Sequence, residues 1–203
     1  MSRNSFDLTN VYSSRRTLDA MIQDCDPDKT RVVIDTCSLL HLGFEKAMDS
    51  MIPVLRRKGM KLVVPYCVAG EVRRKMMQAD VDEDLAHRAR VAIRFINKID
   101  QEGLLVMPRD RNENEFFADS VFLGQCAKLR MHYQVNVITQ DVNLMHDITA
   151  QNMYRSARDF YQIRAWKISW NESRLVSFVW SESKASLKNE RSGSGQSSLP
   201  EAV

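Results

Sequence analysis

The sequence lacks a long apolar run and any grouping of its cysteines, and each absence excludes a class of protein. No stretch approaches the roughly 20 apolar residues that a membrane-spanning helix needs. The four cysteines stand singly, without a Cys-x-x-Cys pair or a nearby grouping of histidines, which argues against a zinc knuckle and a disulfide framework. The four histidines show no spacing typical of a catalytic pair. We therefore expect neither a membrane protein nor a disulfide-stabilised one.

The beginning of the chain bears on its destination, and the net charge bears on its partners. Asp7 and other polar residues precede any apolar segment, so the layout of a signal peptide is missing, and we expect a cytoplasmic protein. A formal net charge of +3 permits nucleic acid as a partner without indicating it. With 203 residues and an apolar fraction of 44%, the chain is long enough for one well-buried domain with extensions.

Short apolar runs alternate with helical patterns through the middle of the chain. The runs at 31–34, 61–64, 104–107 and 135–139 predict strands, with a last edge strand at 162–168. Helical spacing of apolar residues predicts helices at 44–55, 66–77, 80–101, 116–132 and 143–151. Such an alternation implies a parallel sheet with right-handed crossovers. The expected fold is therefore α/β, a three-layer α/β/α sandwich with a central, mostly parallel sheet.

The segments on either side of this alternation predict extensions. Residues 1–30 are largely polar and include a short helix that Ser14 can cap, so we expect a docked N-terminal extension. The alternating segment, 31–168, forms the predicted domain. Tryptophans in the C-terminal extension, 169–182, indicate that it still has apolar surface to bury. Residues 183–203 are rich in Ser, Gly, Lys and Glu, which predicts a flexible tail.

Acidic residues follow the predicted strands. Asp35 comes directly after the first strand and Asp141 follows the fourth, while Glu71 and Asp119 fall near the beginnings of helices. Because the carboxyl ends of parallel strands meet at one edge of the sheet, these four carboxylates are expected to converge there. A different reading of Asp35 stays open, in which it caps the helix that follows it.

Converging carboxylates repel one another unless a divalent cation neutralises them. Oxygen ligands with little histidine or cysteine nearby select Mg²⁺ or Mn²⁺ over zinc. A metal ion held in this way activates a water for attack on a phosphodiester, so the chemistry needs no protein nucleophile. Asp147, beyond Asp141 in the same predicted helix, is either a further carboxylate of this cluster or a solvated helix residue.

The order and surroundings of these acids resemble those of the PIN-domain nucleases, over roughly residues 31–168. Asp35 with Thr36 as its hydroxyl neighbour resembles the first motif, and Thr139 stands two residues before the last acid, where the family commonly has Ser or Thr. The matching segments are Val32 to Leu40, Pro65 to Val72, Ala118 to Ser120 and Ile138 to Asp141.

This resemblance implies a metal-dependent endoribonuclease that hydrolyses single-stranded or structured RNA, as toxins of bacterial toxin–antitoxin pairs and RNA-processing factors do. By the same resemblance, Asp35, Glu71, Asp119 and Asp141 are the catalytic metal ligands, and Thr36 and Thr139 support them. It also implies partners: RNA, an inhibitory or recruiting protein, and a second copy of the chain in a homodimer.

Substrate RNA requires positive charge near the acids, because phosphate contacts come mostly from Arg and Lys. The candidates are Arg56 and Arg57 in one basic run, and Arg73, Arg74 and Lys75 in another, with Arg109 and Arg111 between predicted elements. The alternative for each run is a solvated helix face that does not contact RNA. The run at 73–75 is the stronger candidate because it shares a predicted helix with Glu71.

Two other functions share parts of this pattern. One is a catalytically inactive PIN-fold module that binds RNA or a protein partner, for which the extensions at both ends are the motivation. The other is a phosphoacceptor receiver domain, which also has acids at strand ends. A receiver domain has paired acids early in the chain and a lysine after its last strand, and this sequence shows neither pattern.

Overall fold

The computed structural model describes residues 17–108, 118–153, 160–169 and 174–178. Its strands are β1 (Thr30–Ile34), β2 (Leu62–Val63), β3 (Leu105–Val106), β4 (Gln134–Ile138), β5 (Ile163–Ile168) and β6 (Leu175–Ser177). Its helices are α1 (Leu18–Asp24), α2 (Thr36–Leu39), α3 (Phe44–Lys58), α4 (Tyr66–Met76), α5 (Glu83–Gln101), α6 (Ala118–Leu129) and α7 (Val142–Ala150), with a 3₁₀ turn, η2 (Gln151–Met153).

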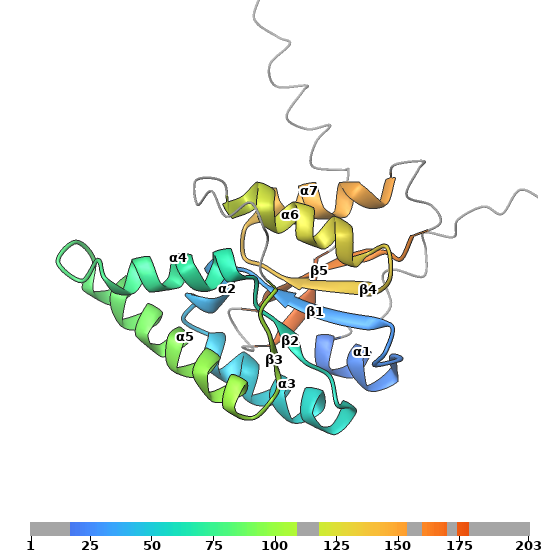
Figure 1. Cartoon of the computed structure of the whole chain (residues 1–203), viewed down its shortest axis with the longest axis horizontal. Helices are drawn as coiled ribbons and strands as arrows, with labels where there is room; N and C mark the ends of the chain where they lie inside the picture. Colours follow the sequence, from blue (N-terminus) through green and yellow to red (C-terminus); the bar gives the residue numbers. More distant parts are fainter. Residues whose placement is uncertain (1–16, 109–117, 154–159, 170–173, 179–203) are drawn as a thin grey trace, which may run out of the picture.

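The strands form one six-stranded sheet in the order β3-β2-β1-β4-β5-β6. Neighbouring strands from β3 to β5 are parallel, and the β5–β6 pair is antiparallel. Figure 1 shows α6 and α7 on one side of the sheet and α1 and α3 on the other. The predicted α/β/α sandwich with a mostly parallel sheet is confirmed.

The central position of β1 explains the apolar run that predicted it. Val32, Val33 and Ile34 are completely buried, since β2 and β4 flank the strand and helices cover both faces. Such a strand has no solvent face on which polar residues would alternate. Ile34 pairs in register with Ile138, so β1 and β4 end at the same level of the sheet. That register places the residues after both strands side by side.

One strand prediction was wrong in its placement. The predicted edge strand at 162–168 is β5, but it lies inside the sheet because β6 pairs with it, with Trp166 opposite Ser177. Only two apolar residues mark β6, too few to show a period in the sequence.

Helix ends follow local capping rules. The long helix α5 starts at Glu83 rather than at Asp80, because the Asp82 side chain accepts a hydrogen bond from the Leu85 amide (2.8 Å) and caps it. At the C-terminal end of α3, Gly59 takes a left-handed conformation with φ of 65°, as expected of a glycine that ends a helix. The predicted cap of the first helix, Ser14, lies outside the described residues, and α1 starts at Leu18 after Thr17.

The hydrophobic core extends to the helix that precedes β1. Leu18 and Ile22 of α1 are completely buried and belong to the same apolar cluster as β1. Backbone pairing of Thr17 with Val176 connects the start of α1 to β6. Among the helices of the described segments, none has both the length and the apolar character needed to cross a membrane.

Candidate metal centre

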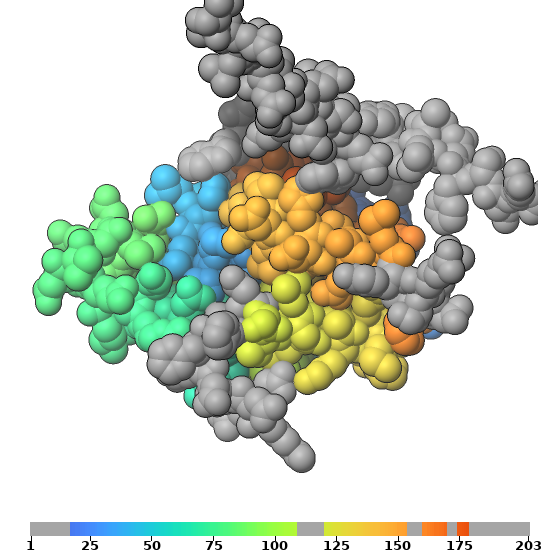
Figure 2. All heavy atoms as spheres, turned by 90° about the horizontal axis from the view of Figure 1, so that it is seen from above, coloured from blue at the N-terminus to red at the C-terminus, as the bar shows by residue number. Residues whose placement is uncertain are grey.

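Three of the four predicted acids line one pocket at the carboxyl edge of the sheet. Asp35 follows β1, Glu71 lies on α4 and Asp141 follows β4. The three acids line a pocket of about 290 Å³, called here the acidic pocket. Its other lining residues are Thr36, Cys37, Leu40, Val68, Phe122 and Leu144. Figure 2 shows the light-blue chain around α2 at the surface between the green helices and the orange α7.

Asp35 is held in place through both of its carboxylate oxygens. Oδ1 accepts a hydrogen bond from the Ser38 amide (2.9 Å) and so caps α2. Oδ2 accepts one from the Thr139 hydroxyl and another from the Cys37 thiol (2.8 Å). Asp35 therefore both caps α2 and lines the acidic pocket.

Burial dominates the electrostatics of Asp35. The residue is only 4% exposed, and loss of solvation raises the pKa of its carboxyl, although the hydrogen bonds from Cys37, Thr139 and Ser38 act in the opposite direction. A buried carboxylate without a neighbouring cation is electrostatically costly, and a bound cation would offset that cost.

Cys37 is a polar residue of the pocket that the sequence did not identify as part of the site. Its side chain lies beside Asp35, and desolvation together with the Asp35 charge raises the pKa of its thiol to about 12. The thiol therefore stays protonated and donates its hydrogen bond to Asp35. The available signal was its position two residues after the first acid, in the first turn of α2.

Two threonines connect the acids to one another. The Thr36 hydroxyl donates to Glu71 Oε2 (2.6 Å), which joins α2 to the second turn of α4. Thr139 donates to Asp35 and accepts a hydrogen bond from the Asp141 amide (3.1 Å). Both predicted supporting hydroxyls thus contact predicted acids.

Asp141 is positioned by the helix that it begins. Its Oδ1 accepts hydrogen bonds from the Asn143 amide (2.8 Å) and the Leu144 amide (3.1 Å), which makes it the N-cap of α7. This geometry holds one carboxylate oxygen against the helix N-terminus. Its second oxygen takes no part in these capping bonds.

The acidic pocket gathers negative charge without a matching cation. Within the segments that the structure describes, none of its three acids forms an ion pair, and no Lys or Arg is among its lining residues. In the same segments, no three Asp, Glu, His or Cys side chains stand close enough to form a compact metal cage. Mg²⁺ usually keeps several waters and binds through one or two carboxylates, so an open pocket with hard oxygen donors fits a hydrated ion of this kind.

Asp119 and Asp147 have different positions relative to this pocket. Asp119 falls in the first turn of α6, and its side chain lies outside the described part of the structure. Phe122, three residues later on α6, lines the acidic pocket. Asp147 is an exposed residue of α7 that is not among the lining residues, as expected of a solvated helix position.

The predicted RNA-binding residues that the structure describes lie on α3 and α4, outside the lining of the acidic pocket. Arg73 and Arg74 are exposed on α4, the helix that carries Glu71, and Lys75 is half-buried there. Arg57 is exposed near the end of α3. None of these residues lines the acidic pocket, and Arg109 and Arg111 lie outside the described residues.

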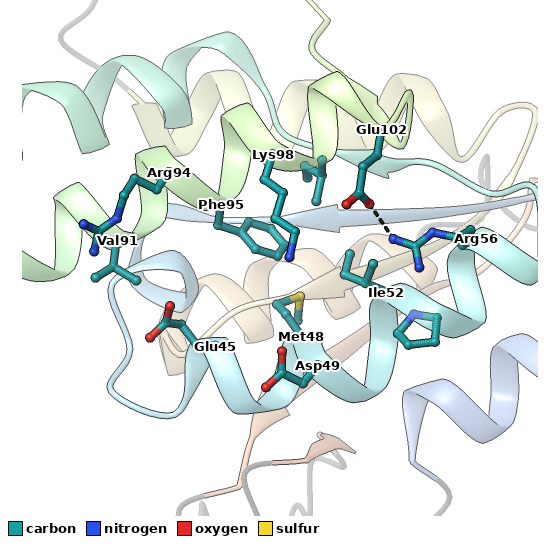
Figure 3. A pocket seen from close by; sticks show the side chains of 12 residues that line it. Glu45, Met48, Asp49, Ile52, Arg56, Val91, Arg94, Phe95, Lys98 and Glu102 are labelled. Atoms are coloured by element: carbon teal, nitrogen blue, oxygen red, sulfur yellow. Dashed lines mark hydrogen bonds and ion pairs between the residues drawn. The ribbon is translucent and has the colours of Figure 1, made fainter.

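Arg56 belongs to a separate hollow between α3 and α5, with a volume of about 330 Å³. Figure 3 shows Glu45 and Asp49 on the α3 side of this hollow and Arg94 and Lys98 on the α5 side. Arg56 Nη2 lies 2.6 Å from Glu102 Oε2, so this guanidinium already has an anionic partner.

Comparison with known proteins identifies a family. A family model described as the PIN domain matches residues 32–154, which is more than half of the chain. The chain belongs to the PIN-domain family. The match runs from β1 to the turn after α7 and contains all four predicted acids. PIN domains have a nuclease-type fold and commonly use divalent metals. A comparison with curated proteins gave no significant match.

Proposed function

We propose that this PIN domain is an endoribonuclease that depends on Mg²⁺ or Mn²⁺. The observation that carries the proposal is the acidic pocket itself: three carboxylates from separate elements line it, and none has a cationic partner among the described residues. Negative charges that share one pocket repel one another unless a cation neutralises them. Helix capping accounts for the positions of Asp35 and Asp141, but not for Glu71, which caps no helix and lines the same pocket.

The residues divide into metal ligands and residues that orient them. Asp35, Glu71 and Asp141 hold the ion, and Asp119 is the fourth ligand, since it lies one helix turn before the pocket residue Phe122. When bound, the divalent ion promotes ionisation of a water for in-line attack and stabilises negative charge on the leaving oxygen.

The chain's own hydrogen bonds prepare the ligands for this role. Thr139 and Cys37 fix one oxygen of Asp35, and Thr36 fixes one oxygen of Glu71. Because folding already orients these groups, they lose less conformational entropy when the ion and the phosphate bind.

Substrate RNA is bound by the basic end of α4. Arg73, Arg74 and Lys75 follow Glu71 on the same helix, so phosphates held there lie along the approach to the acids. Arg56 contributes less, because its ion pair with Glu102 must first be given up. Binding of this kind weakens as salt concentration rises.

The direct test compares Asp141→Asn with Asp147→Asn, two equal changes of charge on the segment around α7. We expect Asp141→Asn to lower RNA cleavage by about a thousandfold, the range seen when an electrostatic catalytic group is removed, while Asp147→Asn cleaves like the parent. Cleavage is measured on a labelled oligoribonucleotide at fixed Mn²⁺ concentration. Unchanged cleavage by Asp141→Asn and by Asp35→Asn would show that the assignment is wrong.

A non-catalytic PIN module remains the second candidate, because the described acids do not form a compact metal cage. Calorimetric titration with Mg²⁺ and Mn²⁺ separates the two candidates. A catalytic domain binds the ion and loses this binding in Asp35→Asn, whereas a scaffold shows no heat of binding at millimolar metal and no RNA cleavage.

A further inference from the structure

A further pocket lies on the face of the sheet that α6 covers, beside the short strands β2 and β3. Val63 and Val106 pair in register, so their side chains point to the same face. Val106 is 41% exposed, which shows that this part of the face is open. Together with Met60 and with Leu129 at the end of α6, they line a pocket of about 490 Å³, called here the sheet-face pocket.

One wall of the sheet-face pocket is a planar, polarised surface. The guanidinium carbon of Arg31 lies 3.7 Å from the centre of the Tyr133 ring. Arg31 Nη1 also donates to the carbonyl oxygens of Thr30 (2.7 Å) and Pro27 (3.1 Å), which fixes the guanidinium over the ring. The stacked pair is therefore held in place before any ligand arrives.

The rim of the sheet-face pocket is positively charged. Lys58 and Lys61 join Arg31 among its lining residues, against a single acid, Asp28. Lys58 Nζ donates to the Cys25 carbonyl (3.3 Å) and keeps further donors for a ligand. Lys61 is exposed and has no hydrogen bond or ion pair with any described residue, so its ammonium is available to an anion.

We infer that the sheet-face pocket binds a nucleotide unit. Its apolar floor and the Arg31–Tyr133 stack suit a planar base, while Lys61 and Lys58 suit a phosphate. Basic side chains beside a stacking surface are the usual means of holding single-stranded nucleic acid. The volume of about 490 Å³ falls in the ordinary range for small-molecule sites.

The ligand is either a free nucleotide or one unit of a single-stranded RNA, and both present the same chemistry. The acidic pocket and the sheet-face pocket share no lining residue. Nucleotide binding in the sheet-face pocket therefore does not depend on the function proposed for the acidic pocket.

The experiment follows amide resonances of the full chain during titration with AMP, with a short oligoribonucleotide, and with inorganic phosphate. EDTA is present throughout, so that metal-dependent cleavage plays no part and a failure of the nuclease proposal leaves the result intact. We expect both nucleotide ligands to shift the resonances of Arg31, Val106 and Tyr133. Lys61→Glu should weaken binding about tenfold, because it reverses a charge at the phosphate.

The matched control is Lys46→Glu, the same change at an exposed lysine on α3 outside this pocket, which should change the affinity less than about twofold. A response to the oligoribonucleotide alone identifies RNA as the source of the nucleotide, and a response to AMP that the oligoribonucleotide does not displace identifies a free nucleotide. The inference is overturned if neither ligand shifts these resonances, or if phosphate alone reproduces the shifts at the same concentration. Equal weakening in both lysine variants would also overturn it.

Discussion

At the residue scale, Asp35 shows the cost of assembling the acidic pocket. It is buried, and Glu71 and Asp141 line the same pocket without a cation among the described residues. Its place after a buried strand made it recognisable from sequence, as did the similar place of Asp141. Cys37 was not recognisable, because a cysteine in an apolar stretch is usually packing material. The Thr36–Glu71 hydrogen bond was equally hidden, since it depends on how α2 lies against α4.

Asp35→Asn should therefore stabilise the metal-free protein, by about 1–2 kcal/mol in the free energy of unfolding. The substitution removes a buried charge, and asparagine caps a helix about as well as aspartate. The Thr139 hydroxyl and the Cys37 thiol, which donate to Asp35 Oδ2, can turn to accept hydrogen bonds from the asparagine amide nitrogen. Urea unfolding in EDTA measures the effect, with the exposed Asp147→Asn as the control that should show no change. Added Mn²⁺ should stabilise the parent but not Asp35→Asn. A loss of stability in metal-free Asp35→Asn would contradict this account of the pocket.

His41, after α2, should make stability depend on pH. Burial and the positive charge of Arg88 lower the pKa of His41 below its ordinary value of 6.5, and its Nδ1 accepts a hydrogen bond from the Gly43 amide (3.0 Å). A depressed folded-state pKa means that the neutral ring stabilises the fold above pH 6.5 and that this contribution is lost as pH falls through the folded-state value.

Unfolding midpoints of the parent and of His41→Asn, measured between neutral and mildly acidic pH, test this expectation. The difference between the two proteins should be largest at neutral pH and shrink on acidification. An NMR titration in which His41 protonates above its ordinary range would contradict it.

At the element scale, most helices and strands followed from local patterns, while the connections between them did not. Apolar runs located β1 to β5, and capping residues such as Asp82 explain the helix starts. β6 was missed because it is short and depends on pairing with β5. The contacts of Arg130 were also beyond sequence reasoning, because they involve the chain after α7 and the chain before β5.

Arg130, directly after α6, joins three elements. It is 4% exposed, and its guanidinium donates to the carbonyl oxygens of Tyr161 (3.1 Å) and Gln151 (2.6 Å). Arg130→Met keeps the apolar stem but leaves both carbonyls without this donor, so we expect a loss of about 2–4 kcal/mol in the free energy of unfolding. Arg57→Met, at an exposed position of α3, is the matched control and should change stability little. Equal stability of Arg130→Met and the parent in urea unfolding would contradict this role.

At the scale of the whole molecule, the parallel sheet brings acids from distant parts of the sequence to one edge. Fold class and the meeting of Asp35, Glu71 and Asp141 were predictable because every carboxyl end of a parallel strand lies on that edge. The sheet-face pocket was not, since it depends on how far α6 extends across β2 and β3. The charged hollow between α3 and α5 likewise depends on how two helices pack.

The most direct test of the central claim is anomalous diffraction from crystals of the full chain soaked in millimolar Mn²⁺. The account predicts an anomalous peak in the acidic pocket, within coordination distance of carboxylate oxygens of Asp35 and Asp141, with Glu71 in direct or water-mediated contact. A pocket without such a peak, in crystals whose acids point into open solvent channels, would contradict it.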